Sequence, residues 1–99
     1  MIDHIVLLKP KSKVSESALA ALWVGIQGLQ TQIPGIQAIH VGSNTSPEDL
    51  DRGFTLGFTV RFDDAAARDA YLPHPEHLAV VPLVLAVADE VLVFDLDIG

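Results

Sequence analysis

Apolar residues recur along this chain with two different periods, and the exchange between them predicts four strands and three helical stretches. Alternation of apolar and polar residues is typical of a strand, because successive strand side chains point to opposite faces of a sheet. Apolar residues spaced three and four apart share one face of a helix. Strands are therefore expected at 4–9, 36–41, 54–62 and 91–97, and helices at 16–33, 65–72 and 78–90.

The strand at 54–62 has the clearest pattern, because every second residue is large and apolar and the residues between them are small or polar. One face of this strand is expected in the core, and the other could meet a partner sheet. The strand at 4–9 is apolar on both faces, which is typical of a central strand, and it places His4, Val6 and Leu8 on one face. At 36–41 the alternation places Ile36, Ala38 and His40 together.

Capping residues and prolines set the expected helix ends. Ser15 is suited to cap the first helix, and Pro34-Gly35 ends it. Trp23 lies on the apolar face of this helix and is expected in the core. Asp63 and Asp64 can cap the second helix, and Pro82 is expected to kink the third.

The order of elements is β-α-β-β-α-β, which predicts an α+β fold of the ferredoxin-like type within a single domain over residues 1–99. In that fold an antiparallel sheet of four strands carries its helices on one face. The other face is bare unless a second copy covers it. At 49% hydrophobic and 19% charged residues the chain is apolar for its 99-residue size, which also indicates a covering subunit.

Charge and composition exclude several classes of partner. The net charge is −7 and no basic stripe is present, which argues against nucleic acid and anionic membranes. The longest apolar run, 78–88, is too short to span a bilayer, which needs about 20 residues. There is no cysteine, so thiolate chemistry and disulfides are excluded. The start of the chain does not read as a signal peptide, and a soluble, cytoplasmic protein is expected.

The candidate chemistry is concentrated at residues 71–77, Tyr-Leu-Pro-His-Pro-Glu-His. The two prolines break the helix that arrives from 65–72, and Pro75 is suited to begin a new helix with His74 at its cap. His77 then lies in the first turn, where the helix dipole favours the neutral imidazole. A neutral imidazole beside the phenol of Tyr71 suits proton abstraction next to a carbonyl, with the phenol stabilising the oxyanion.

Other interpretations of these residues remain open at this point. The stretch could be a proline-kinked helix junction with a surface histidine pair and a half-buried tyrosine. His4, His74 and His77 could together form an open zinc site, although no acidic residue or cysteine completes it. His4 is the expected contributor to an active site from elsewhere in the chain. His40 is expected on the sheet surface or in a subunit contact.

Segments across the whole chain resemble the stress-responsive A/B barrel (Dabb) family of dimeric α+β barrel proteins. The resemblance is carried by HIVLLK, IPGI, RGFTLGFTVRF, YLPHPEH and VLVFDLD at 4–9, 33–36, 52–62, 71–77 and 91–97. It implies a homodimer in which two copies pack their open sheet faces into one barrel. Most bacterial members have no established reaction, so a non-catalytic dimer for stress response or small-ligand binding is one expectation.

The Tyr-x-x-His-Pro-x-His pattern also resembles a plant polyketide cyclase of this family, which makes olivetolic acid. That resemblance implies a cofactor-free aldol condensation of a poly-β-keto thioester, with His77 as base, Tyr71 on the carbonyl or enolate, and His4 assisting. A small hydrophobic or β-keto ligand is the expected partner. Leu22, Ile26 and Leu56 stand where the cyclase has aromatic residues or a histidine. The expected pocket residues are Val6, Leu8, Leu22, Trp23, Ile26, Leu56, Phe58 and His74.

Overall fold

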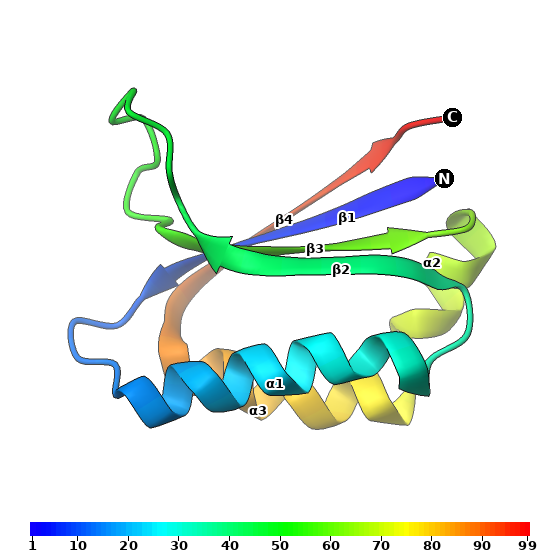
Figure 1. Ribbon diagram of the computed structural model, residues 1–99, viewed down its shortest axis with the longest axis horizontal. Coiled ribbons are helices and arrows are strands. Elements are labelled where there is room, and N and C mark those ends of the chain that lie inside the picture. Colours follow the sequence, from blue (N-terminus) through cyan, green and yellow to red (C-terminus); the bar gives the residue numbers. More distant parts are fainter.

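Four strands form one antiparallel sheet in the computed structural model, which describes residues 1–99, and the helices lie on one side of that sheet (Figure 1). The strand order is β2-β3-β1-β4, so β1 is central, as its two apolar faces predict. This is the ferredoxin-like fold expected from the sequence. The elements are β1 Ile2–Pro10, α1 Glu16–Gln32, β2 Ile36–Ser43, β3 Leu56–Phe62, α2 Ala65–Tyr71, α3 Pro75–Val87 and β4 Ala88–Asp97.

The predicted caps begin the helices. The Ser15 side chain accepts a hydrogen bond from the backbone N–H of Ala18 at 3.1 Å, which satisfies one of the free donors of α1. Asp64 accepts from Ala67 in the same way at 2.8 Å and begins α2. The turn between α1 and β2 requires Gly35, because its φ is +88° and an added Cβ would lie 2.7 Å from the Cβ of Ala67.

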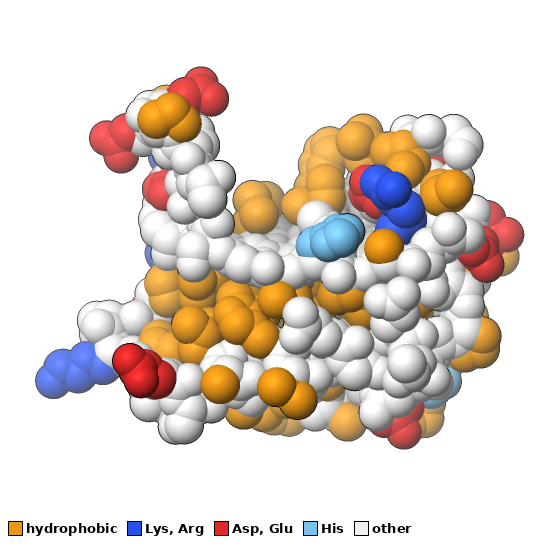
Figure 2. Space-filling view, in the orientation of Figure 1, with side chains coloured by type: hydrophobic (Ala, Val, Ile, Leu, Met, Phe, Trp, Pro, Cys, Tyr) orange, Lys and Arg blue, Asp and Glu red, His pale blue; other side chains and the backbone are white.

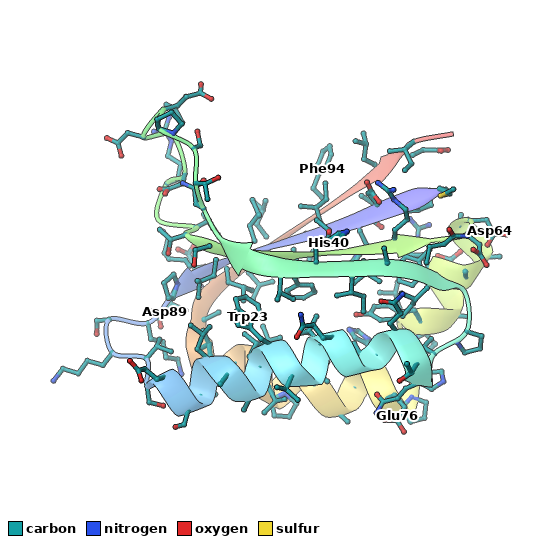
Figure 3. All side chains as sticks on the ribbon, viewed as in Figure 1. Trp23, His40, Asp64, Glu76, Asp89 and Phe94 are labelled. Atoms are coloured by element: carbon teal, nitrogen blue, oxygen red, sulfur yellow. The ribbon has the colours of Figure 1, made fainter.

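The core lies between the sheet and the helices. Alternate residues of β1 face the helices, and Leu8 on this face is completely buried. Trp23 is half-buried, packs against the core and lies between α1 and the sheet (Figure 3). The buried apolar residues are Ile2, Val6, Leu8, Leu22, Ile26, Leu29, Ile33, Phe58, Val60, Phe62, Tyr71, Val80, Val87 and Ala88.

Three expectations about element boundaries and faces are corrected. The register of β2 shifts between Ile36 and Ala38, so Ile36 packs against the core instead of sharing a face with His40. Strand β3 begins at Leu56, and Phe54 lies in the preceding loop, where the Lys9 ammonium stands 5.2 Å from the centre of its ring. Strand β4 begins at Ala88 because its pairing with β1 extends beyond the predicted start.

The sheet surface opposite the helices, here called the open face, is not covered by any element (Figure 1). Phe94 and His40 both lie on this side of the sheet (Figure 3). The segment 44–55 between β2 and β3, here called the arm, projects from the same side, and a hollow of about 490 Å³ lies between it and the open face (Figure 2). None of the helices has the length and apolar character that a membrane span needs.

Candidate functional site

The two prolines set the position of the break between α2 and α3, and the histidines on either side of Pro75 take different roles there. Helix α2 ends at Tyr71, and α3 begins at Pro75 with His74 as its cap. The Nδ1 atom of His74 accepts a hydrogen bond from the backbone N–H of Glu76 at 3.1 Å. This imidazole is thus used by the backbone of α3, while His77 lies one turn further along.

His77 and Tyr71 form a stacked pair. Their ring centroids lie 4.2 Å apart with an angle of 30° between the planes. The Nδ1 atom of His77 is 2.9 Å from the carbonyl oxygen of Leu72, to which only an N–H can donate. In the neutral ring this bond fixes the proton on Nδ1, so Nε2 carries the lone pair and can accept a proton.

The Tyr71 hydroxyl has no hydrogen-bond partner in the protein, although the residue as a whole is only 1% exposed. Tyr71 lines a cavity, and no fully enclosed polar side-chain atom of the protein lacks a partner, so this hydroxyl is not sealed within packed protein. Burial raises the pKa of Tyr71 to about 12, because the phenolate would be poorly solvated there. The side chain is therefore a neutral hydrogen-bond donor at physiological pH.

A third polar group reaches the same region from β1. His4 is 6% exposed, and its Nδ1–H donates to Asp95 Oδ1 across the β1–β4 pair at 2.6 Å. The other oxygen of Asp95 accepts from Arg68 Nη1 at 2.9 Å. Burial by itself would raise the pKa of Asp95, but the hydrogen bonds from His4 and Arg68 outweigh burial and lower it.

These groups border a cavity of about 260 Å³, here called the helix-side cavity, between α3, β1 and β4. Its polar side chains are one phenol and two imidazoles, and the rest of its wall is apolar. Such a wall with a few convergent polar groups is typical of a small-molecule site. The lining residues are His4, Val6, Phe58, Tyr71, Leu72, His77, Val81, Val84, Leu85, Val91 and Val93.

The structure brings together the three predicted catalytic residues and two of the predicted pocket residues, Val6 and Phe58. The prediction that the other pocket residues line this cavity is corrected. Helix α1 packs against β2 and α3, so its residues fill the core away from the cavity. The His74 side chain caps α3 instead of lining the cavity. The residues outside the wall are Leu8, Leu22, Trp23, Ile26, Leu56 and His74.

Sequence reasoning missed Asp95 and Arg68, and it missed the contribution of α3 and β4 to the wall. One signal was present, because Asp95 is a carboxylate within the apolar strand VLVFDLD, on the face that it shares with Val91 and Val93. Its partner His4 is 91 positions away, and that pairing does not follow from the sequence. No group of three or more His, Cys, Asp or Glu residues is arranged to hold a metal ion.

The sequence model of the stress-responsive A/B barrel domain family (Dabb) matches residues 2–98 of this chain. The chain belongs to this family. A curated Arabidopsis thaliana relative, stress-response A/B barrel domain-containing protein HS1, is 32% identical over 94 residues, which cover 95% of this chain and 86% of HS1. Membership in this family does not establish the polyketide cyclase activity that the resemblance of residues 71–77 implied.

Two solved structures place this family chain among its structural neighbours. A dimeric ferredoxin-like protein of unknown function from Jannaschia sp. CCS1 is 29% identical, with a TM-score of 0.87 and 98% of each chain covered. A hydroxynitrile lyase from Passiflora edulis is 22% identical, with a TM-score of 0.88 over 99% of this chain and 93% of the lyase. At that identity the second likeness concerns the fold alone.

Proposed function

We propose that this protein binds a small carbonyl compound in the helix-side cavity and abstracts a proton next to the carbonyl, as a cofactor-free lyase or cyclase. One observation carries the proposal: Tyr71 and His77, whose rings stack on each other, both line one apolar cavity. Neither Tyr71 nor His77 is paired with a carboxylate, because the Asp95 carboxylate is bonded to His4 and Arg68.

The chemistry follows from the two free atoms. His77 Nε2 takes a proton from the carbon next to the carbonyl, so that a C–H bond breaks, an N–H bond forms and the electron pair moves to oxygen. The Tyr71 hydroxyl donates to that oxygen, and a donor in an apolar cavity stabilises developing charge more than it would in water. In a cyclase the enolate carbon attacks a second carbonyl of the same molecule, and the His77 proton passes to the new alkoxide.

The wall supports an uncharged reacting group. No lysine or arginine lines the cavity, and Arg68, which is linked to His4 through Asp95, is already bonded to Asp95 and Asp69 at 2.9 and 3.0 Å. An ionised ligand group would lie among valine and leucine side chains without an opposite charge, which is costly. A ketone, a β-diketone or the β-keto part of a longer chain meets this requirement.

Two copies of the chain associate through the open face in this proposal. The Jannaschia neighbour is described as dimeric, and its likeness covers nearly the whole of this chain. The open face also carries large apolar side chains that are about half exposed in a single copy, which is unfavourable in water. These are Leu92 at 45%, Phe94 at 57% and Leu96 at 46%, all on β4.

Deuterium exchange tests the proton abstraction. Acetophenone in deuterium oxide is expected to lose its methyl proton signal faster with the protein present. His77→Gln should lower the catalysed rate by about 100-fold or more, the range for loss of a general base. His74→Gln is the matched control, because this imidazole caps α3 and is not part of the cavity wall. Equal rates for wild type and His77→Gln would contradict the proposal.

A non-catalytic binding dimer is the second candidate, and the almost wholly apolar wall favours it. Titration with 1-phenyl-1,3-butanedione, followed through the imidazole signals of His77 and His4, separates the two candidates. A binder would show shifts of these signals with no catalysed exchange. If neither signal moves and no exchange occurs, the cavity has neither role for this class of compound.

A further inference from the structure

We propose that Arg68 is a positioning residue for His4: it holds the Asp95 carboxylate so that His4 presents Nε2 as a second acceptor in the helix-side cavity. The inference rests on the proposed function, because it assigns a role to a neighbour of the same site. It also narrows the ligand to a compound that carries a hydroxyl or enol as well as a carbonyl.

The His4 ring is fixed from three sides. Asp95 stands directly opposite in the β1–β4 register and binds Nδ1 at 2.6 Å. Phe62 and Tyr71 each contact the ring edge-to-face, with centroids 6.2 and 5.8 Å away. The aromatic neighbours set the plane of the ring, and the carboxylate decides which nitrogen carries the proton. With Nδ1–H bonded to Asp95, Nε2 is left as the acceptor.

Asp95 needs a partner to play this part, because it lies on the edge strand β4 with 24% of its side chain exposed. A carboxylate held through one oxygen can turn about its last torsion, which is broad. Arg68 binds the second oxygen, so Oδ1 remains directed at His4. Asp69 binds Nε of the same guanidinium and holds it from the other side at 3.0 Å.

The charge of this chain of contacts also matters. Arg68 neutralises the Asp95 carboxylate, so the carboxylate can orient His4 without requiring an imidazolium in the cavity. Without Arg68 the partly exposed carboxylate would have no cationic partner beside the ring, and a proton on Nε2 would compensate for it. The guanidinium therefore preserves the lone pair on which the proposed contact depends.

The result is one donor between two acceptors. Tyr71 lies beside both His77 and His4, with ring centroids 4.2 and 5.8 Å away. A ligand whose carbonyl oxygen accepts from the Tyr71 hydroxyl can place a hydroxyl or enol hydrogen on His4 Nε2. Enolised β-diketones and β-hydroxy ketones have these two groups one carbon apart, whereas a simple ketone lacks the second.

The test measures the His4 tautomer by nitrogen NMR of the side chain, without any ligand. In the wild type the two-bond proton couplings should report a protonated Nδ1 and an unprotonated Nε2. Arg68→Met is expected to produce a mixture of tautomers or a protonated Nε2. Arg61→Met is the matched control, since Arg61 forms a separate arginine–aspartate pair, with Asp3 at 2.8 and 3.0 Å, and neither residue lines the cavity.

Arg68→Lys is the second variant, used also if Arg68→Met does not fold. Lysine keeps the charge but lacks the planar fork that binds two carboxylates at once, so an intermediate tautomer population is expected. Affinity for 1-phenyl-1,3-butanedione should fall by about 10-fold in Arg68→Met, the lower end of the range for losing the partner behind a metal-binding histidine. Affinity for acetophenone should change much less.

An unchanged His4 tautomer in both Arg68 variants would overturn the inference, as would an equal change in Arg61→Met. These outcomes are separate from the proposed function, because the tautomer is read in the free protein. If no carbonyl compound binds but the tautomer shifts as expected, the proposed function fails and the positioning role of Arg68 is retained. If exchange is catalysed but the His4 tautomer is unchanged, the proposed function is retained and the positioning role of Arg68 fails.

Discussion

The two faces of the sheet are built from alternate residues of the same strands, and they differ in what they do with polar groups. On the helix side of β1, His4 and Leu8 are buried, and the polar atoms there serve the cavity. On the open side, the neighbours of Ile5 and Leu7 on β4 are the half-exposed Phe94 and Leu92. One face is closed within the chain, whereas the other leaves large apolar side chains uncovered in a single copy.

Each face has one arginine–aspartate pair that joins two elements, and the two pairs differ in what surrounds them. Arg61 and Asp3 on the open face form a bidentate pair with no further member, and 45% of the Arg61 side chain is exposed. Arg68 and Asp95 form a single bond, but Asp95 continues to a buried histidine. The bidentate geometry belongs to the Arg61–Asp3 pair, neither member of which lines the cavity. The geometry of an ion pair alone therefore does not identify a functional one.

The largest contrast between the faces is expected in stability. Leu8→Ala, on the helix side, removes a completely buried side chain and should cost about 2–5 kcal/mol in the free energy of unfolding. Leu92→Ala, on the open face, removes a side chain that is 45% exposed in one copy. Its effect should act mainly through self-association, so the loss of stability should be present at protein concentrations at which the wild type is dimeric and should shrink on dilution. Urea unfolding at two concentrations measures both, and equal, concentration-independent losses would contradict the contrast.

The burial of Tyr71 on the helix side predicts that its phenol ionises at a higher pH than an exposed tyrosine does. Tyr71 is the only tyrosine, so its phenolate absorbance in the near ultraviolet reports one group. The folded protein should titrate with a pKa of about 12, against about 10 after denaturation. Because the folded pKa is the higher one, its contribution to stability is complete below pH 10. That contribution, about 3 kcal/mol for two pKa units, is lost as the pH rises to 12.

Tyr71→Phe is the control for this titration, since it removes the only phenol while keeping the ring. Its free energy of unfolding should not show the decline between pH 10 and 12 that is assigned to Tyr71. A folded wild type that titrates near 10 would mean that water reaches the hydroxyl freely, and the low-dielectric cavity on which the oxyanion argument depends would be lost.

The sequence predicted those features of the two faces that depend on local patterns. The caps at Ser15 and Asp64 and the restart at Pro75 follow from short-range chemistry, and all three are confirmed. The alternation of β3 also identified its buried face. Local signals suffice in these places because each involves residues within four positions of one another.

The remaining features depend on contacts between distant segments. The shift between Ile36 and Ala38 appears only when β2 pairs with β3, and the early start of β4 appears only when β4 pairs with β1. The cavity wall was misplaced because the position of α3 over β4, and of α1 away from it, is set by packing. The hydrogen bond from His4 to Asp95 joins residues near the two ends of the chain and has no local signal.

A charge on the open face should separate the two copies. Phe94→Glu places a carboxylate in the proposed interface and should weaken self-association by at least about 2 kcal/mol, roughly 30-fold, which is typical for loss of a buried aromatic anchor. Leu85→Glu is a matched control, because Leu85 is 58% exposed, almost as Phe94 is at 57%, but lies beside the cavity on α3. Sedimentation velocity of both variants measures the effect. Dissociation by Leu85→Glu alone would place the interface on the helix side.

The smallest effects are expected from acid titration of the two aspartates. The hydrogen bond from Arg61 lowers the pKa of Asp3, against a smaller opposing effect of burial, and the pKa of Asp95 is also lowered. A folded pKa below the unfolded value of 3.8 means that each carboxylate stabilises the fold above that pH, and that this stabilisation is lost as the pH falls through the folded pKa. Asp3→Asn and Asp95→Asn should each flatten the acid limb of the stability curve slightly, because partly exposed pairs contribute little.

The faces should nevertheless differ in one respect at neutral pH. Asp95→Asn should change the His4 side-chain nitrogen signals, because it alters the acceptor that holds Nδ1–H, whereas Asp3→Asn should leave them as in the wild type. Chemical denaturation between pH 3 and 7, with nitrogen NMR at pH 7, measures both properties in the same pair of variants. Identical His4 spectra for the two variants would show that the pair on the helix side is as independent of the cavity as the pair on the open face.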